Sequence, residues 1–174
     1  HAIETYISRK SNPLVRNQSV SCILNVFKHL IPACKENDLE AMEKIAISSA
    51  LMGINLAFSS TCLPHRIQYI IGPLTHTSHA QGLIALYKGW LFNLEKNNIK
   101  ELAELANDLG LTTKEFLDQI QDLKTNLNID YTISDLGIKE HEIEKIANNV
   151  TGNVSADPSY KNINTIYNIL KNSL

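Results

Sequence analysis

The sequence predicts an all-α fold, a compact helical bundle. Two observations support this prediction: apolar residues recur along most of the chain at the spacing of a helix face, and no segment alternates convincingly between apolar and polar residues at period two. The chain has 174 residues, of which 44% are hydrophobic, and this is enough to build one sizeable core. We therefore expect a single helical domain over residues 1–174.

Two long helices are predicted in the first third of the chain. The first begins just after Asn12-Pro13, because proline fits the first turn of a helix, and it has an apolar stripe at Val20, Ile23, Leu24, Phe27, Leu30, Ile31 and Cys34. The second runs from about Asp38 to Phe58, and its residues from Ala50 onward are apolar on almost every side. A helix that is apolar all round is usually buried, so we expect this one to lie centrally.

The segment between Cys62 and Trp90 has a different pattern. Gly72-Pro73 interrupts what would otherwise be one helix, and the helical period resumes near His79. Because proline removes a backbone donor and clashes with the preceding turn, we expect two helices joined by a bent loop at this point.

Four shorter helices are predicted after this segment. One spans 99–109 and is closed by Gly110, a residue suited to a left-handed C-terminal cap. The next starts at Thr112 to Glu115, which have capping-box spacing. Two further apolar stripes, at 143–150 and 163–170, predict the last helices.

The charges and the hydrophobic segments exclude several partner classes. The 16 basic and 18 acidic residues give a net charge of -2 and form no block of one sign, which argues against a nucleic-acid or membrane surface. No stretch approaches the roughly 18 apolar residues of a membrane span, and the N-terminus has no signal-sequence pattern. We expect a cytoplasmic protein, and self-association into a homo-oligomer stays open.

Three of the six histidines lie in one segment, at 65, 76 and 79. If His65 lies on one helix and His79 opens the next, the bend between them can direct both imidazoles to a common point, as ligands of a divalent metal require. Two alternatives remain open. These histidines can be ordinary polar loop residues, or His76 and His79 can form a local helical pair, which would need further ligands.

Two motifs resemble those of the iron-containing alcohol dehydrogenase family. The start His1-Ala-Ile-Glu4 is similar to the family's His-Ala-x-Glu helix start, and His65 through Gly82 resembles its long histidine signature. The tail is also similar, with Asp135-Leu-Gly-Ile138 and a loop from Gly152 to Pro158. The resemblance covers most of the chain and implies the all-helical, metal-binding C-terminal half of the dehydroquinate synthase-like fold.

The resemblance implies a site for Fe²⁺ or Zn²⁺ held by His1, His65 and His79, with an aspartate four residues before His1 that this sequence does not contain. It also implies NAD(P) as cofactor and a small alcohol or aldehyde as substrate. No glycines are grouped as in a pyrophosphate-binding turn, so we expect the nucleotide to bind an N-terminal domain outside this sequence. The fragment alone is then expected to be inactive.

Two further residues take candidate roles from the resemblance. Tyr69 stands where the family usually has a histidine near the nicotinamide, and Leu56 aligns with a substrate-pocket position. Simple packing is the alternative for both, on the wall of the site for Tyr69 and in the helix core for Leu56. For the whole chain, the alternatives are a non-catalytic helical remnant or oligomerisation module, or another reaction on the same fold, such as glycerol dehydrogenation or the metal-dependent cyclisation of a sugar acid.

Overall fold

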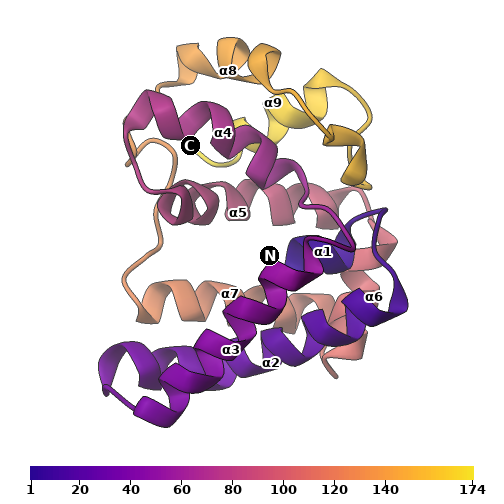
Figure 1. Ribbon diagram of the computed structural model, residues 1–174. Helices are drawn as coiled ribbons and strands as arrows, with labels where there is room; N and C mark the ends of the chain where they lie inside the picture. The colour runs from indigo at the N-terminus through magenta and orange to yellow at the C-terminus, as the bar shows by residue number, and fades with distance from the viewer. The chain divides into compact units, whose positions relative to one another are not determined.

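Nine α-helices and two short 3-10 helices make up the regular structure of the computed structural model, which describes all residues 1–174 and contains no strand (Figure 1). The all-α prediction is confirmed. Contacts within the chain divide it into two units, one formed by His1–Ser60 and Lys100–Asn128, the other by Thr61–Ile99 and Ile129–Leu174. They are called unit 1 and unit 2 below. The single domain stays a prediction.

Unit 1 consists of five helices: α1 (Ala2–Ile7), α2 (Pro13–Lys35), α3 (Leu39–Asn55), α6 (Lys100–Asp108) and α7 (Thr113–Asn126). Polar side chains start α2 and α3. The Asn12 side chain accepts a hydrogen bond from the Val15 N–H, and the Asp38 side chain accepts one from the Ala41 N–H, each at 3.1 Å. These bonds satisfy backbone donors that have no partner inside the helix.

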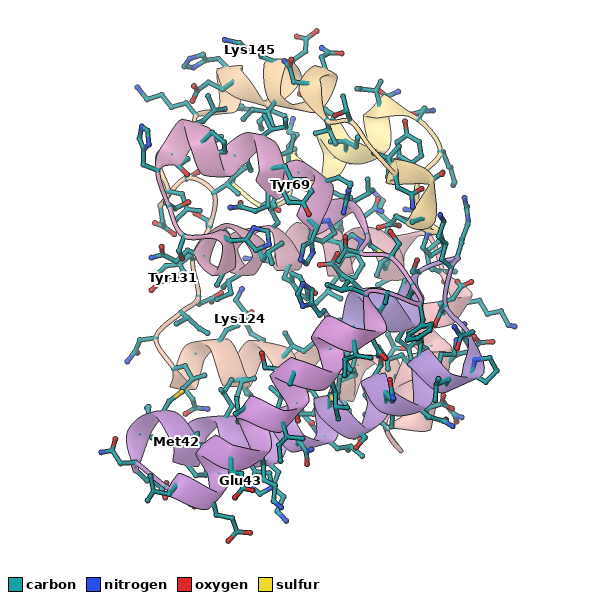
Figure 2. All side chains as sticks on the ribbon, in the orientation of Figure 1. Met42, Glu43, Tyr69, Lys124, Tyr131 and Lys145 are labelled. Atoms are coloured by element: carbon teal, nitrogen blue, oxygen red, sulfur yellow. The ribbon has the colours of Figure 1, made fainter.

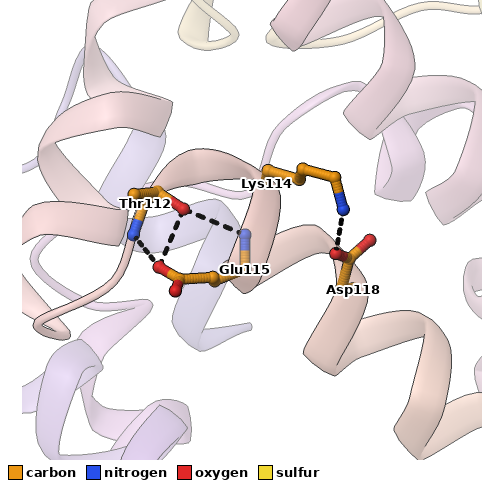
Figure 3. Close-up of polar contacts among 4 residues, drawn as sticks. All are labelled: Thr112, Lys114, Glu115 and Asp118. Carbon is orange, nitrogen blue, oxygen red and sulfur yellow. Dashed lines mark hydrogen bonds and ion pairs between the residues drawn. The ribbon is translucent and has the colours of Figure 1, made fainter.

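The predicted capping box starts α7 (Figure 3). The Glu115 carboxylate accepts hydrogen bonds from the Thr112 N–H and hydroxyl, both at 2.8 Å, and the Glu115 N–H donates to the Thr112 hydroxyl at 3.2 Å. In the same helix, Lys114 forms an ion pair with Asp118, which lies one turn later on the exposed face. The start of this helix is therefore determined locally.

The predicted burial of the second long helix is wrong. Only Ala41, Ser48, Met52 and Asn55 of α3 are buried, and apolar residues such as Leu39 and Ile54 are exposed. The reason is that α3 packs mainly on α2, which covers one face of the helix and leaves apolar residues on its other sides exposed. Figure 2 shows Met42 and Glu43 near the start of this helix.

Polar and cationic contacts join α1, α2 and α6. The Tyr6 hydroxyl donates a hydrogen bond to Asp108 at 2.5 Å, and the Arg16 guanidinium lies 4.7 Å from the centroid of the Tyr6 ring. Arg16 and Lys100 both form ion pairs with Glu104, at 2.9 and 2.6 Å. The hydrogen bonds from Lys100 and Arg16 lower the pKa of Glu104 from its ordinary value.

This ion-pair cluster predicts a loss of stability in acid. A carboxyl group with a lowered folded-state pKa stabilises the fold above its unfolded-state pKa, and it loses that contribution as the pH falls through the folded-state value. We expect Glu104→Gln to lower the urea midpoint at pH 7, and the difference from wild type to shrink as the pH falls below about 4. A difference that stays constant from pH 7 to pH 3 would contradict the assignment.

Unit 2 contains the α-helices α4 (Leu63–Thr75), α5 (His79–Lys96), α8 (Ile143–Asn149) and α9 (Ile163–Lys171), and the 3-10 helices η1 (Glu140–Glu142) and η2 (Val154–Ala156). Helix α5 packs against α4 and α9, and α8 packs against α4 and α9 (Figure 1). Gly89 makes the contact of α5 with α9 possible, because a Cβ there would lie 2.3 Å from the Ile169 carbonyl oxygen. None of the helices in either unit has the length and apolar character needed to cross a membrane.

The predicted break at Gly72-Pro73 is wrong in its position. Helix α4 continues through both residues to Thr75 and is capped by His76, which has φ 54° and ψ 24° in the left-handed region. Pro73 lies in the last turn of α4. The missing N–H costs one backbone hydrogen bond there, and few residues follow that the proline could disturb. The bend therefore comes three residues later than predicted, between α4 and α5.

A buried carboxylate connects three parts of unit 2. Asp157 is fully buried, and one of its oxygens accepts hydrogen bonds from the Leu63 N–H at 3.1 Å and the Trp90 indole N–H at 2.7 Å. The other oxygen accepts from the Ser159 N–H at 2.8 Å and the Ser159 hydroxyl at 2.6 Å. Burial raises the pKa of Asp157, and these four hydrogen bonds oppose the rise. The carboxylate thus joins the start of α4, the middle of α5 and the loop before α9.

We expect Asp157→Asn to destabilise the protein by about 3 kcal/mol, because the amide must place an NH₂ group against donors that have no other partner. The measurement is the free energy of unfolding in urea. Asp135→Asn is the matched control, since Asp135 is an exposed carboxylate that accepts two bonds from Thr132 through one oxygen. An amide oxygen can replace that acceptor, so the control should cost less than about 1 kcal/mol. Equal effects of the two changes would refute the proposed role of Asp157.

Candidate metal centre

His65 lies in the first turn of α4, in the interior of unit 2. Cys62 precedes the helix, and Pro64 occupies the first turn, where the missing N–H costs no helical hydrogen bond. The Leu63 N–H is satisfied by Asp157. The His65 side chain is 2% exposed. A buried carboxylate therefore anchors the turn that carries this imidazole.

His79 is the first residue of α5, as the sequence predicts. Ser78 caps the helix: its hydroxyl accepts a hydrogen bond from the Gln81 N–H, and the Gln81 side chain accepts one from the Ser78 N–H. His76 lies outside this helix, at the left-handed end of α4. The alternative helical pair of His76 and His79 is therefore not formed.

The hairpin of α4 and α5 brings His65 and His79 together. Their ring centroids are 5.1 Å apart and their planes are inclined by 63°. With metal–nitrogen bonds of about 2.0–2.1 Å and a tetrahedral angle, two imidazoles on one divalent ion have centroids roughly 5 Å apart. The centroid separation of the pair therefore matches that of two imidazoles on one divalent ion. Its role as a ligand pair stays a prediction.

A glycine on each of α4 and α5 leaves room for a buried side chain beside this pair. Gln68, one turn after His65, is buried, and its amide lies where side chains on Gly82 and Gly72 would be. A Cβ on Gly82 would lie 1.7 Å from the Gln68 Oε1 atom, and a Cβ on Gly72 would lie 2.9 Å from Nε2. The amide of Gln68 thus occupies the space beside Gly72 on its own helix and beside Gly82 on α5.

We expect Gly82→Ala to lower the free energy of unfolding by roughly 1–3 kcal/mol, because the buried Gln68 amide must move or the helices must separate. Gly53→Ala in α3 is the control, since no atom lies within 4 Å of a Cβ at that position, and alanine there should stabilise the helix by about 0.5–1 kcal/mol. The double variant Gln68→Ala/Gly82→Ala should recover part of the loss. If Gly82→Ala is as stable as Gly53→Ala, the contact is not a constraint.

The third predicted ligand, His1, belongs to unit 1. It precedes α1, and its carbonyl oxygen accepts hydrogen bonds from the Thr5 N–H at 2.9 Å and the Thr5 hydroxyl at 2.7 Å. No group of three or more histidine, cysteine, aspartate or glutamate side chains is placed to hold a metal ion. The assignment of His1 as a ligand stays a prediction.

The two weaker candidates lie in different units. Leu56 directly follows α3 in unit 1 and is partly buried. Tyr69 lies on α4 in unit 2, where its ring stacks on His79 with a centroid distance of 6.0 Å and an interplanar angle of 15°. Tyr69 therefore lies beside the pair, and the role near a nicotinamide that the resemblance implies for it stays a prediction. The substrate-pocket role that the resemblance implies for Leu56 stays a prediction.

Sequence reasoning missed three residues that shape the pair: Asp157, Gln68 and Gly82. Asp157 was recognised only as part of a turn, because nothing in the sequence shows that its carboxylate reaches two helices. Gly82 carried a weak signal, since a glycine inside a helix costs about 1 kcal/mol relative to alanine. Gln68 carried none.

The fold and the pair define a class of protein: an all-helical domain with two neighbouring imidazoles at the junction of two helices. The model of the Fe-containing alcohol dehydrogenase family, C-terminal, matches residues 1–174. The chain therefore belongs to the iron-containing alcohol dehydrogenase family and corresponds to its C-terminal part.

Curated relatives are similar to the chain at low identity. The 4-hydroxybutyrate dehydrogenase of Clostridium kluyveri is 27% identical over 158 residues, which cover 86% of this chain and 43% of that protein. The NAD-dependent methanol dehydrogenase of Bacillus methanolicus is 24% identical over 186 residues, which cover 100% of this chain and 49% of that protein. The chain thus spans about half the length of the curated relatives it matches.

Solved structures show the same fold. The crystal structure of a 1,3-propanediol oxidoreductase superposes on the whole chain with a TM-score of 0.87 and 24% identity, and the match covers 49% of that structure's chain. This likeness confirms the predicted helical half of the iron alcohol dehydrogenase fold.

Proposed function

We propose that this chain is the metal-binding half of an NAD(P)-dependent alcohol dehydrogenase or aldehyde reductase that acts on a small alcohol or aldehyde. The observation that carries the proposal is the approach of the His65 and His79 rings to 5.1 Å. Membership of the iron-containing family supports it, and so do the dehydrogenase names of the relatives. We assign the whole reaction to a longer polypeptide, because the matched relatives are about twice as long as this chain.

The proposed site uses His65 and His79 as neutral imidazole ligands and His1 as the third, with Fe²⁺ or Zn²⁺ as the ion. When bound, a divalent metal supplies Lewis acidity that stabilises negative charge on the oxygen of an alcohol or aldehyde. The protein's part is to hold both imidazoles in place. Burial of His65 supports this, because the atoms packed around its ring restrict its movement.

We expect His65→Ala and His79→Ala in the complete polypeptide to weaken metal binding by roughly 100-fold or more, because loss of a ligand exceeds the 10–100-fold effect of losing an outer partner. Metal-dependent oxidation of NAD(P)H with small aldehydes should fall with it. The measurements are metal content after dialysis and absorbance at the NAD(P)H band. His141→Ala is the control, since His141 is an exposed histidine in η1.

The complete polypeptide tests the proposal directly. Metal-dependent activity in the wild type and the His141 variant, lost in the other two, supports it. A wild-type protein that binds no iron or zinc and oxidises no NAD(P)H in their presence would rule it out.

A second candidate function, a non-catalytic oligomerisation module, is favoured by one observation. Large apolar side chains are exposed along α2 and α3 and just after α3: Leu14, Leu24, Leu39, Met42, Ile47, Ile54 and Phe58. Exposed apolar residues that gather on neighbouring elements are typical of interaction surfaces. A metal-free, inactive protein that sediments as an oligomer would favour this candidate over the first.

A further inference from the structure

Arg66 is an isolated charge in the sequence. Between Lys44 and Lys88 it is the only residue that is an aspartate, glutamate, lysine or arginine. It directly follows His65 on α4, and neither the rest of α4 nor α5 before Lys88 contains another such residue. The part of the hairpin that carries the histidine pair therefore has one permanent charge, and that charge is positive.

No acidic residue neutralises this charge. No carboxylate forms an ion pair with Arg66 in the structure. The buried carboxylate of the same unit, Asp157, accepts its four hydrogen bonds from other donors. Arg66 is partly buried, and a charge in such a position is screened less by salt than one at an open surface. The guanidinium is thus a cation without a counter-ion.

The hydrogen-bond donors of Arg66 are only partly used. Its Nη2 atom donates to the Thr61 hydroxyl at 2.7 Å, and its Nε atom is buried without a hydrogen-bond partner. Its Nη1 atom lies beside Gly152, where a Cβ would come to 3.4 Å and no side chain is present to accept a bond. A guanidinium presents its donors in a fixed plane that matches the oxygens of a carboxylate. Arg66 therefore retains both charge and donor capacity for an anion.

Arg66 and His79 contact the same aromatic ring. The Arg66 Cζ atom is 4.9 Å from the centroid of the Tyr69 ring and the His79 centroid is 6.0 Å from it, so the guanidinium carbon lies at most about 11 Å from the His79 ring. The Tyr69 side chain, shown on α4 in Figure 2, is 53% exposed, which leaves the ring accessible to a ligand from solvent. One short-chain molecule can therefore reach from the guanidinium to the histidine pair.

We propose that Arg66 binds a carboxylate of the substrate, and that the preferred substrates are short-chain aldehydes and alcohols with a carboxylate at the other end of the chain. The proposal rests on the proposed function, which assigns the reacting oxygen to the metal at the histidine pair. The carboxylate supplies the counter-charge that no residue of the chain supplies. Its distance from the reacting carbon then selects the chain length.

The first test measures binding and needs no activity. The Arg66 Nε–H signal is followed by NMR in the complete polypeptide labelled with nitrogen-15, and it is assigned with the Arg66→Lys variant. Burial of Nε slows the exchange of its proton with water, which makes the signal observable. We expect 4-hydroxybutanoate to shift this signal saturably, and 1-butanol or sodium chloride at the same concentrations to leave it in place.

The second test compares kcat/KM for 4-oxobutanoate and for butanal, which has the same chain length and no carboxylate. Wild type should prefer 4-oxobutanoate. Arg66→Gln should lower kcat/KM for 4-oxobutanoate roughly 10–100-fold, as expected for loss of a hydrogen bond to a charged group, and change that for butanal less than about 3-fold. Arg66→Lys should keep part of the preference, because it keeps the charge and loses the planar fork. Lys88→Gln removes an exposed positive charge from α5 and is the matched control, which should affect neither substrate.

The outcomes separate this proposal from the proposed function. Equal losses with both aldehydes in Arg66→Gln overturn the carboxylate role, because Arg66 would then serve the fold or the reaction in general. A higher KM for NADPH with an unchanged aldehyde preference also overturns it, since the anion would then be a phosphate of the cofactor. If wild type reduces neither aldehyde, the proposed function fails, and the NMR titration alone decides: no shift of the Arg66 signal by 4-hydroxybutanoate overturns the binding role.

Discussion

The arrangement of unit 2 depends on the hydrogen bonds to one buried carboxylate. Asp157 accepts from the first helical N–H of α4 and from the indole of Trp90 in α5, so the two helices share one acceptor. A buried carboxylate without donors would be very costly, and this makes the four bonds obligatory and directional. His65 comes two residues after Leu63, so the position of its ring relative to α5 follows from this anchor.

Two further sets of side-chain contacts surround the histidine pair: those of the buried Gln68 and those of the exposed Tyr69. The buried amide of Gln68 occupies the space beside Gly72 on its own helix and beside Gly82 on α5. At the surface, Tyr69 stacks on His79 and carries Arg66 on its own ring.

Unit 1 shows that an apolar helix is not necessarily a buried one. The residues of α3 from Ala50 onward are apolar on almost every side, yet the helix packs mainly on α2 and leaves Leu39, Ile47 and Ile54 exposed. Hydrophobicity predicts which residues gain from burial. Whether a partner surface is present in the chain depends on the whole packing arrangement, which the local pattern does not contain.

The sequence by itself determined the helices, most of their ends and the family. Asn12, Asp38, Ser78 and the Thr112–Glu115 box act on backbone donors within three residues, so their effect could be read locally. Only the tertiary structure decided that α4 runs through Pro73 and that His65 and His79 lie 5.1 Å apart. It also revealed the contacts of Gln68, Tyr69 and Asp157. The physical reason is range: caps and periodicity act within a few residues, whereas these contacts join residues as far apart as Leu63 and Asp157 and exist only once the helices have packed.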